Sequence, residues 1–321
     1  MADTLPAVPT PEPGPLPAIA CFDLYEMIMS GRAARTARAY ESDFKDFARF
    51  VSAPSPAAAL DRLTALPQGT ANACALAYRA HLTARGLSPA TVARRLAALR
   101  SAVKLARTLG RVGWTLDVDP PRVRSYRDTR GPGADGWRAL LERARSEATT
   151  PKGRRDLALV RLLHDLALRR GEAVGLDVEH FDRDAGTVAV LGKGQAARTR
   201  LTLPGPTRQA LAAWLADRGE QPGPLFVRLD RGARGVPGRL TGRNVARVVG
   251  ALGRRAGLAR AVKPHGLRHC AITEVLDLTG GDVRAAAKFS RHARLETLLV
   301  YDDSRRDVAG ELARRLAGDG G

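Results

Sequence analysis

The chain has 321 residues, of which 44% are hydrophobic, and its formal net charge is +19 at pH 7. This length allows two domains with packed cores, and the charge favours a polyanionic partner, most simply nucleic acid, although an arginine-rich proteome would raise the charge too. No apolar stretch reaches the length of a membrane span, and the first residues lack the basic and apolar segments of a secretory signal. We therefore expect a cytoplasmic protein.

The cysteines and the ligand motifs predict no bound metal and no cofactor. Cys21, Cys74 and Cys270 are an odd number without paired spacing, which is typical of reduced thiols inside cells. The sequence contains no zinc-finger, EF-hand or Walker pattern.

Changes in composition divide the chain into five segments. Prolines predict a disordered leader at the start, and prolines with scattered arginines predict an extended basic linker between two domains. The segments are a leader at 1–18, a helical domain at 19–112, a linker at 113–133, a second domain at 134–304 and a terminal helical tail at 305–321.

The first domain is predicted to be all-helical. Apolar residues recur at helical spacing over 35–51, and a second helix is expected over 68–85. A third helix is expected to start after Ser88, because serine is a favoured N-cap and Pro89 suits the first turn. This helix would end near Gly110.

The third of these helices has a basic face. From residue 81 to residue 112 there are seven lysines and arginines and no aspartate or glutamate. A solvated helix face usually mixes both signs of charge, so we expect this face to contact the phosphate backbone of double-stranded DNA. The candidate contacts are Arg94, Arg95, Arg100, Lys104, Arg107 and Arg111.

The linker adds three candidate phosphate contacts, Arg122, Arg124 and Arg127. An extended basic segment can follow a DNA backbone. A plain spacer between two domains would have the same composition, and for any single arginine the two interpretations are equally good.

The second domain is predicted to be mixed α/β and mainly helical. Helices are expected over 136–147, 154–168, 207–218 and 243–256. Three short strands are expected at 178–181, 187–191 and 199–203, joined by glycine-containing turns, which predicts a small antiparallel sheet.

The stretch 263–301 holds the strongest candidate site. Pro264 suits the first turn of a helix, which would place His265 and Arg268 on one face, a pairing suited to phosphate oxygens. Asp282 is expected to cap a second helix, which is followed by His292. Tyr301 follows His292 by nine positions.

This pattern of His-x-x-Arg, His and Tyr resembles the tyrosine recombinase, or phage integrase, family. Upstream, Arg169 is followed three residues later by Glu172, just past a predicted helix, as the family's pattern has it. The turn lysine, Lys193, also matches in place. The resemblance implies an N-terminal core-binding domain with a SAM-like fold and a catalytic domain with six catalytic residues, which would be Arg169, Lys193, His265, Arg268, His292 and Tyr301.

The resemblance also implies the roles of these residues. Arg169 and Arg268 would grip the non-bridging phosphate oxygens, with Glu172 supporting Arg169, and the two histidines would add hydrogen bonds. His265 would also accept the proton of Tyr301, whose attack on phosphorus would leave a 3′-phosphotyrosyl ester. Lys193 would protonate the leaving 5′ oxygen.

One departure and two rival functions accompany this interpretation. The family commonly has Leu-Gly before the second histidine, whereas here Ser290 and Arg291 precede His292. The rivals are a topoisomerase that relaxes supercoils with the same residues and a DNA-binding protein that has lost catalysis. The filled catalytic pattern speaks against the loss of catalysis, and the short N-terminal part favours a simple recombinase acting on short inverted core sites.

The terminal tail predicts how the protein assembles. Val308, Leu312 and Leu316 form a narrow apolar stripe on an otherwise charged helix, which must be buried against something. It would pack on its own catalytic domain or, as the resemblance favours, on a neighbouring protomer. We expect a monomer in free solution and a tetramer on DNA.

Overall fold

A computed structural model describes residues 23–121, 131–192, 194–229 and 238–292, together with Leu298 and Ala317. The chain forms two compact units, residues 1–125 and 126–321. The predicted leader, the linker arginines, Lys193, Tyr301 and the apolar stripe of the tail lie outside the described residues. No helix in the described ranges combines the length and the apolar character that crossing a membrane requires.

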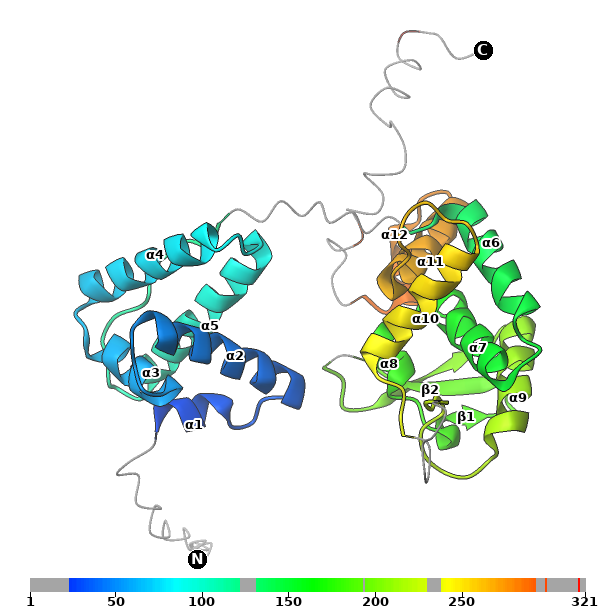
Figure 1. Ribbon diagram of the computed structural model, residues 1–321, viewed down its shortest axis with the longest axis horizontal. Helices are drawn as coiled ribbons and strands as arrows, with labels where there is room; N and C mark the ends of the chain where they lie inside the picture. The colour runs from blue at the N-terminus through cyan, green and yellow to red at the C-terminus, as the bar shows by residue number, and fades with distance from the viewer. Residues whose placement is uncertain are drawn as a thin grey trace, which may run out of the picture. The chain divides into compact units, whose positions relative to one another are not determined.

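The first unit is helical, as predicted, and Figure 1 shows it in blue and cyan. Serine N-caps start two of its helices, since Ser55 accepts from the Ala58 backbone N–H at 3.1 Å and Ser88 from that of Thr91 at 3.4 Å. Its helices are α1 (Leu24–Met29), α2 (Ala34–Phe50), α3 (Pro56–Ala65), α4 (Gln68–Ala84) and α5 (Pro89–Thr108).

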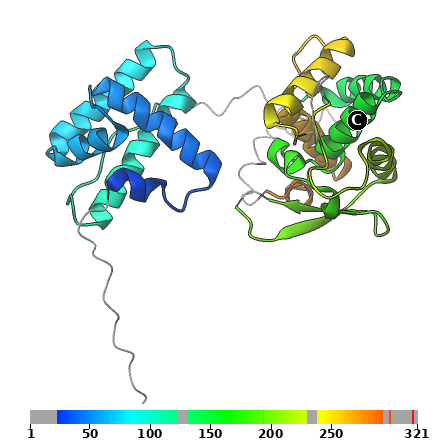
Figure 2. The same ribbon diagram turned by 60° about the horizontal axis from the view of Figure 1, so that its bottom comes forward.

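The second unit combines helices with a small sheet, again as predicted. Figure 2 shows the strands along one edge of this unit, with the helices grouped on one side of them. Its elements are α6 (Gly133–Ser146), α7 (Pro151–Asp165), α8 (Arg170–Val174), η1 (Val178–His180), β1 (Phe181–Asp182), β2 (Thr187–Leu191), β3 (Arg198–Thr202), α9 (Gly205–Arg218), α10 (Gly242–Arg255), α11 (Pro264–Leu278) and α12 (Val283–Ser290).

The sheet is antiparallel with the order β1-β2-β3. Val188 and Val190 of β2 are buried in the main core of the unit, while β3 is largely exposed. The predicted first strand is wrong over most of its length, because residues 178–180 form a 3₁₀ helix instead. His180 Nδ1 accepts from the Asp177 backbone N–H at 2.8 Å, and this local bond stabilises a turn rather than an extended chain.

A smaller core fixes α11 against α12. Ile272 and Leu276 of α11 pack with Ala286 of α12, together with Ala167 and Leu298, and all five side chains are buried. Ala167 lies in the loop that follows α7, in a left-handed conformation with φ 45°. This cluster therefore joins the segment preceding Arg169 to the two helices that carry the downstream candidate residues.

Candidate active site

Arg268 is the centre of the candidate site. It lies on the first turns of α11, which begins at Pro264, and the residue is only 1% exposed. Its guanidinium donates to the carbonyl of Ala167 and, through Nη2, to the carbonyl of Ser290 at 2.5 Å. A buried charge requires such hydrogen bonding, and here the two acceptors come from two different segments. Arg268 therefore holds the loop after α7 and the end of α12 in register.

Arg169 occupies the N-cap position of α8, beside the acid that the sequence assigns to it. Glu172 accepts from Arg169 Nη1 at 2.7 Å and from the Arg169 backbone N–H at 2.9 Å. Burial acts to raise the pKa of Glu172, but the bonds to Arg169 and the charge of Arg291 outweigh it and lower the pKa. The Arg169 side chain is 32% exposed, so it is held by Glu172 and still reaches solvent.

Arg291 joins this cluster, and sequence reasoning did not assign it a role. It follows α12 in a left-handed conformation, with φ 56° and ψ 44°, which favours glycine over residues with a side chain. Its guanidinium donates to Glu172 Oε2 at 3.0 Å and to the Leu166 carbonyl at 3.0 Å. Its own carbonyl accepts from Arg169 Nη2 at 3.3 Å. Glu172 thus bridges two arginines from segments far apart in the chain.

His292 lies next to Arg268 and is held as a neutral ring. The Ser290 hydroxyl donates to the Ala286 carbonyl at 2.6 Å, so its oxygen is available to accept from His292 Nδ1 at 2.7 Å. The other ring nitrogen, Nε2, lies 3.2 Å from Arg268 Nη2 and accepts from it in this tautomer. Burial and the nearby charges of Arg268 and Arg169 lower the pKa of His292 to about 4.

His265 occupies the exposed side of the first turn of α11. It belongs to the same electrostatic cluster, since its charge contributes to lowering the pKa of His292. The described residues therefore bring together Arg169, Glu172, His265, Arg268 and His292, while their catalytic roles stay predictions. Lys193 and Tyr301 lie outside the described residues, so their assignment stays a prediction.

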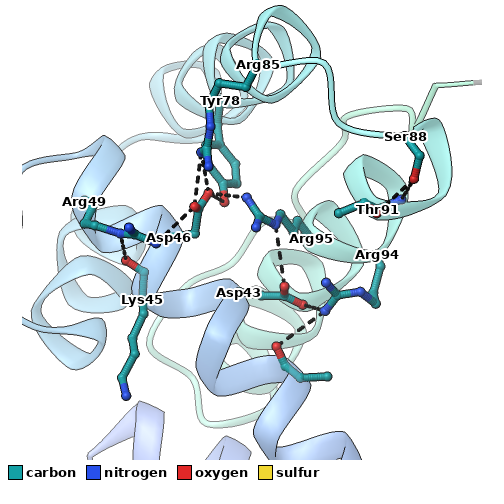
Figure 3. Close-up of polar contacts among 11 residues, drawn as sticks. Asp43, Lys45, Asp46, Arg49, Tyr78, Arg85, Ser88, Thr91, Arg94 and Arg95 are labelled. Atoms are coloured by element: carbon teal, nitrogen blue, oxygen red, sulfur yellow. Dashed lines mark hydrogen bonds and ion pairs between the residues drawn. The ribbon is translucent and has the colours of Figure 1, made fainter. Parts of the chain in front are cut away.

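The basic residues of the first unit differ in how deeply they are buried. Figure 3 shows two of them, Arg94 and Arg95, beside the aspartates with which they pair. The Arg95 side chain is only 12% exposed and pairs with Asp43 and Asp46 of α2, which are buried. Arg94, with 44% of its side chain exposed, also pairs with Asp43. The two buried carboxylates therefore hold the charge of Arg95 inside the unit, and its assignment as a phosphate contact stays a prediction.

The two aspartates differ in how fully they are compensated. Burial raises the pKa of Asp43, although Arg94 and Arg95 oppose that rise. Burial also acts on Asp46, but hydrogen bonds from Tyr78 at 2.9 Å and Arg85 at 3.1 Å, with the charge of Arg95, lower its pKa overall. This network connects α2, α4 and α5 through charge as well as through apolar packing.

The remaining basic residues of α5 stay near the surface. Lys104 and Arg107 are exposed, and Arg100 is half-buried. Arg111, just beyond the helix, lies 3.7 Å from Asp61. Lys104 and Arg107 are therefore accessible cations among the predicted DNA contacts of the first unit that the structure describes.

Comparison with known proteins gives a consistent result. Residues 134–307 match the phage integrase family model. The chain is 40% identical over 302 residues to tyrosine recombinase Synpcc7942_B2651 of Synechococcus elongatus, covering 92% of this chain and 93% of that protein. It is 35% identical over 311 residues to tyrosine recombinase slr0733 of Synechocystis, covering 96% of this chain and 98% of that protein.

A solved structure shares the fold at low sequence identity. The Tn1549 transposon integrase in complex with transposon right end DNA is similar with a TM-score of 0.67 and 14% identity, covering 92% of this chain and 98% of that one. At this identity the likeness concerns the fold alone.

Proposed function

Because the chain belongs to the phage integrase family and is a tyrosine-type site-specific recombinase, we propose that it exchanges strands of double-stranded DNA in the cytoplasm through a covalent phosphotyrosyl intermediate. The exchange would occur at short inverted core sites, and its outcome would be the integration or excision of a DNA segment. The reaction would need neither a metal ion nor ATP.

The main support for this proposal is that two arginines donate hydrogen bonds to the same turn. Arg268 donates to the Ser290 carbonyl at 2.5 Å, and Arg169 donates to the neighbouring Arg291 carbonyl at 3.3 Å. Two guanidinium groups held by adjacent peptide units present two cations to one small anion. A phosphodiester has two non-bridging oxygens that need such partners as negative charge develops in the transition state.

The covalent step is assigned to Tyr301. Its phenolic oxygen would bond to phosphorus while the bond to the 5′ oxygen breaks. His265 would take the phenol proton, and Lys193 would give a proton to the departing 5′ oxygen. The product is a 3′-phosphotyrosyl ester, so a 5′-hydroxyl of another strand can attack it and restore a phosphodiester bond. No external energy source is needed for this exchange.

We propose that His292 orients the guanidinium of Arg268. As a neutral imidazole that accepts from Arg268 and donates to Ser290, it orients the guanidinium in the direction that the backbone carbonyls also favour. Donation from His292 to a phosphate oxygen, expected from the resemblance, would require a change of tautomer or protonation when DNA arrives.

Covalent trapping tests the proposed function. The full chain is incubated with nicked duplexes tiled from the DNA that flanks its gene, without Mg²⁺ or nucleotide, and resolved on a denaturing gel. We expect a protein–DNA adduct at a core site and a free 5′-hydroxyl on the released strand. Cleavage that depends on Mg²⁺ and leaves both ends free of protein would contradict the proposal.

We further propose that residues 305–321 pack on a neighbouring protomer within a tetramer assembled on two duplexes. The apolar stripe of Val308, Leu312 and Leu316 supplies the contact surface. A truncation ending at Ser304 should still bind one site but lose cooperative occupancy of paired sites, which gel shifts on one-site and two-site DNA would measure. Undiminished cooperativity would show that the segment packs on its own protomer.

A further inference from the structure

A buried group of three potential metal ligands lies outside the proposed catalytic machinery. His164 lies near the end of α7, and Cys270 and Glu274 lie one turn apart on α11. One ligand atom from each residue falls within 4.8 Å of the other two. At about 100° per residue, Cys270 and Glu274 lie about 120° or more around α11 from Arg268, so they occupy a different face of the helix.

The spacing of the donor atoms suits a tetrahedral ion. Glu274 Oε2 lies 3.3 Å from His164 Nε2, and Glu274 Oε1 lies 3.2 Å from Cys270 Sγ. Zinc bonds of about 2.0 Å to nitrogen or oxygen and 2.3 Å to sulfur separate neighbouring donors by roughly 3.3 to 3.7 Å. Small rotations of these side chains would therefore place all three atoms on one ion.

His164 is prepared as a ligand by the groups around it. Its side chain is only 8% exposed, and its Nε2 lies 3.3 Å from Glu274 Oε2. Burial acts to lower the pKa of His164, but the contacts to Asp165 and Glu274 outweigh it and raise the pKa, so an ion at Nε2 would have to displace a proton there. Its Nδ1 lies 3.0 Å from Asp165, which in turn accepts from Thr207 at 2.5 Å and Arg161 at 3.0 Å. Metal-binding histidines characteristically donate their other ring nitrogen to a carboxylate in this way.

The ring is also fixed in its plane. Trp137 of α6 stacks on His164 with ring centroids 3.9 Å apart and planes inclined by 14°. A ring held between an indole and a carboxylate has little rotamer freedom left to lose on binding an ion. The Glu274 side chain is 32% exposed, which gives an ion a route from solvent and leaves room for water as a fourth ligand.

The chemistry of the donors selects the ion. One nitrogen, one sulfur and one oxygen suit zinc and its neighbours among the first-row metals, whereas Mg²⁺ and Ca²⁺ prefer oxygen alone. A thiolate at Cys270 and the carboxylate of Glu274 would neutralise a divalent charge inside the protein. Without an ion, burial and the adjacent Glu274 raise the pKa of the Cys270 thiol, and the ion would have to displace that proton.

We propose that His164, Cys270 and Glu274 form a binding site for a divalent zinc-class cation that fastens α7 to α11. Arg169 follows α7 closely and Arg268 lies on α11, so the ion would stiffen the connection between the two phosphate-binding arginines. The sequence offers no motif for this site, because Cys270 follows His164 by 106 positions. The ion's role would be structural, with no contact to the phosphate.

Metal titration of the full reduced chain tests this proposal. We expect one Zn²⁺ per chain in competition with a chromophoric chelator, no binding of Mg²⁺, and a higher melting temperature with Zn²⁺. Co²⁺ should show thiolate charge-transfer absorption and the strong visible bands of a tetrahedral site. The rate of DNA cleavage at 25 °C should stay unchanged when Zn²⁺ is removed.

Matched variants locate the ion. Cys270→Ala and Glu274→Gln should each weaken Zn²⁺ binding about a hundredfold or more, and Asp165→Asn about tenfold to a hundredfold. Cys74→Ala, which removes the other described free thiol, should bind as the wild type does. Equal Zn²⁺ affinity of Cys270→Ala and the wild type would overturn the proposal and leave a buried ion pair.

The cobalt spectrum tests whether Cys270 binds the ion even if the Cys270→Ala variant fails to fold. The chain has only three cysteines, Cys21, Cys74 and Cys270. A double variant, Cys21→Ala with Cys74→Ala, should therefore keep the full charge-transfer band. Absence of that band from the double variant at saturating Co²⁺ would equally overturn the proposal.

Discussion

Each unit of the molecule buries charged groups, but the two units use their arginines in opposite ways. In the first unit the buried groups are acids, and Arg94, Arg95 and Arg85 surround Asp43 and Asp46 (Figure 3). In the second unit the central buried group is the cation Arg268, which donates to backbone carbonyls and lies beside a neutral histidine.

This difference distinguishes arginines that stabilise the fold from arginines that are available to bind an anion. In the first network each arginine forms an ion pair with a buried carboxylate of the same unit. In the second cluster Glu172 is shared between Arg169 and Arg291, while Arg268 donates to backbone carbonyls, which carry no formal charge. The excess positive charge of this cluster would be stabilised by an anionic ligand bound beside it.

The largest expected effect is on catalysis in the second cluster. Arg268→Ala should lower the single-turnover rate of DNA cleavage by about 10³-fold, because it removes a preorganised donor to the transition state. Binding of duplex DNA should change little. Arg268→Lys, which keeps the charge but not the fork of donors, should recover only part of the rate. A rate close to that of the wild type would show that Arg268 has only a packing role.

The converse expectation applies to the first network. Arg95→Ala should lower the free energy of unfolding by about 3 kcal/mol, because it leaves buried carboxylates without their partner. Urea denaturation of the first unit measures this loss. Arg107→Ala, at an exposed position of the same helix, should change stability by less than about 0.5 kcal/mol. Equal stabilities for the two variants would contradict the structural role of Arg95.

Arg291 tests whether the bridging carboxylate matters to the chemistry. Arg291→Gly keeps a residue suited to the left-handed conformation but removes the bond to Glu172. We expect the cleavage rate to fall by about 10²-fold through misplacement of Arg169, with unchanged DNA affinity. Single-turnover kinetics and gel shifts separate these two quantities. A parallel loss of both would point instead to local unfolding of the turn.

The smallest effect is expected on the basic face of α5. Replacing Arg100, Lys104 and Arg107 with glutamine should weaken binding to all DNA sequences alike. The slope of log affinity against log salt should become shallower by about 0.9 for each phosphate that the protein no longer neutralises. Fluorescence anisotropy at several salt concentrations measures this slope. If neither affinity nor slope moves, this face is only solvated.

Local signals made much of this architecture predictable from sequence. The Ser88-Pro89 start of α5 and the Asp282 cap of α12 depend on neighbours in the chain, and the structure has both. The pairing of Arg169 with Glu172 spans only three residues. The Ser55-Pro56 start of α3 carries the same signal as the start of α5, so that helix was predictable in the same way.

What sequence reasoning missed depends on contacts between distant segments. The role of Arg291 requires Glu172, 119 residues away, and nothing near Arg291 indicates that partner. In the sequence, nothing distinguishes Arg95 from its basic neighbours. Its ion pairs with Asp43 and Asp46 form only when α2 packs on α5. Periodicity finds the face of a helix, but it does not reveal which charges the fold will bury.

The central claim is that Tyr301 forms the covalent bond to DNA, and one pair of variants tests it directly. Tyr301→Phe removes only the attacking oxygen, so it should bind core-site DNA as the wild type does yet give no adduct on a nicked duplex. Tyr40→Phe is the control, since Tyr40 contacts Ser101 within the first unit and should trap DNA normally. An adduct that persists in Tyr301→Phe at the wild-type level would contradict the account.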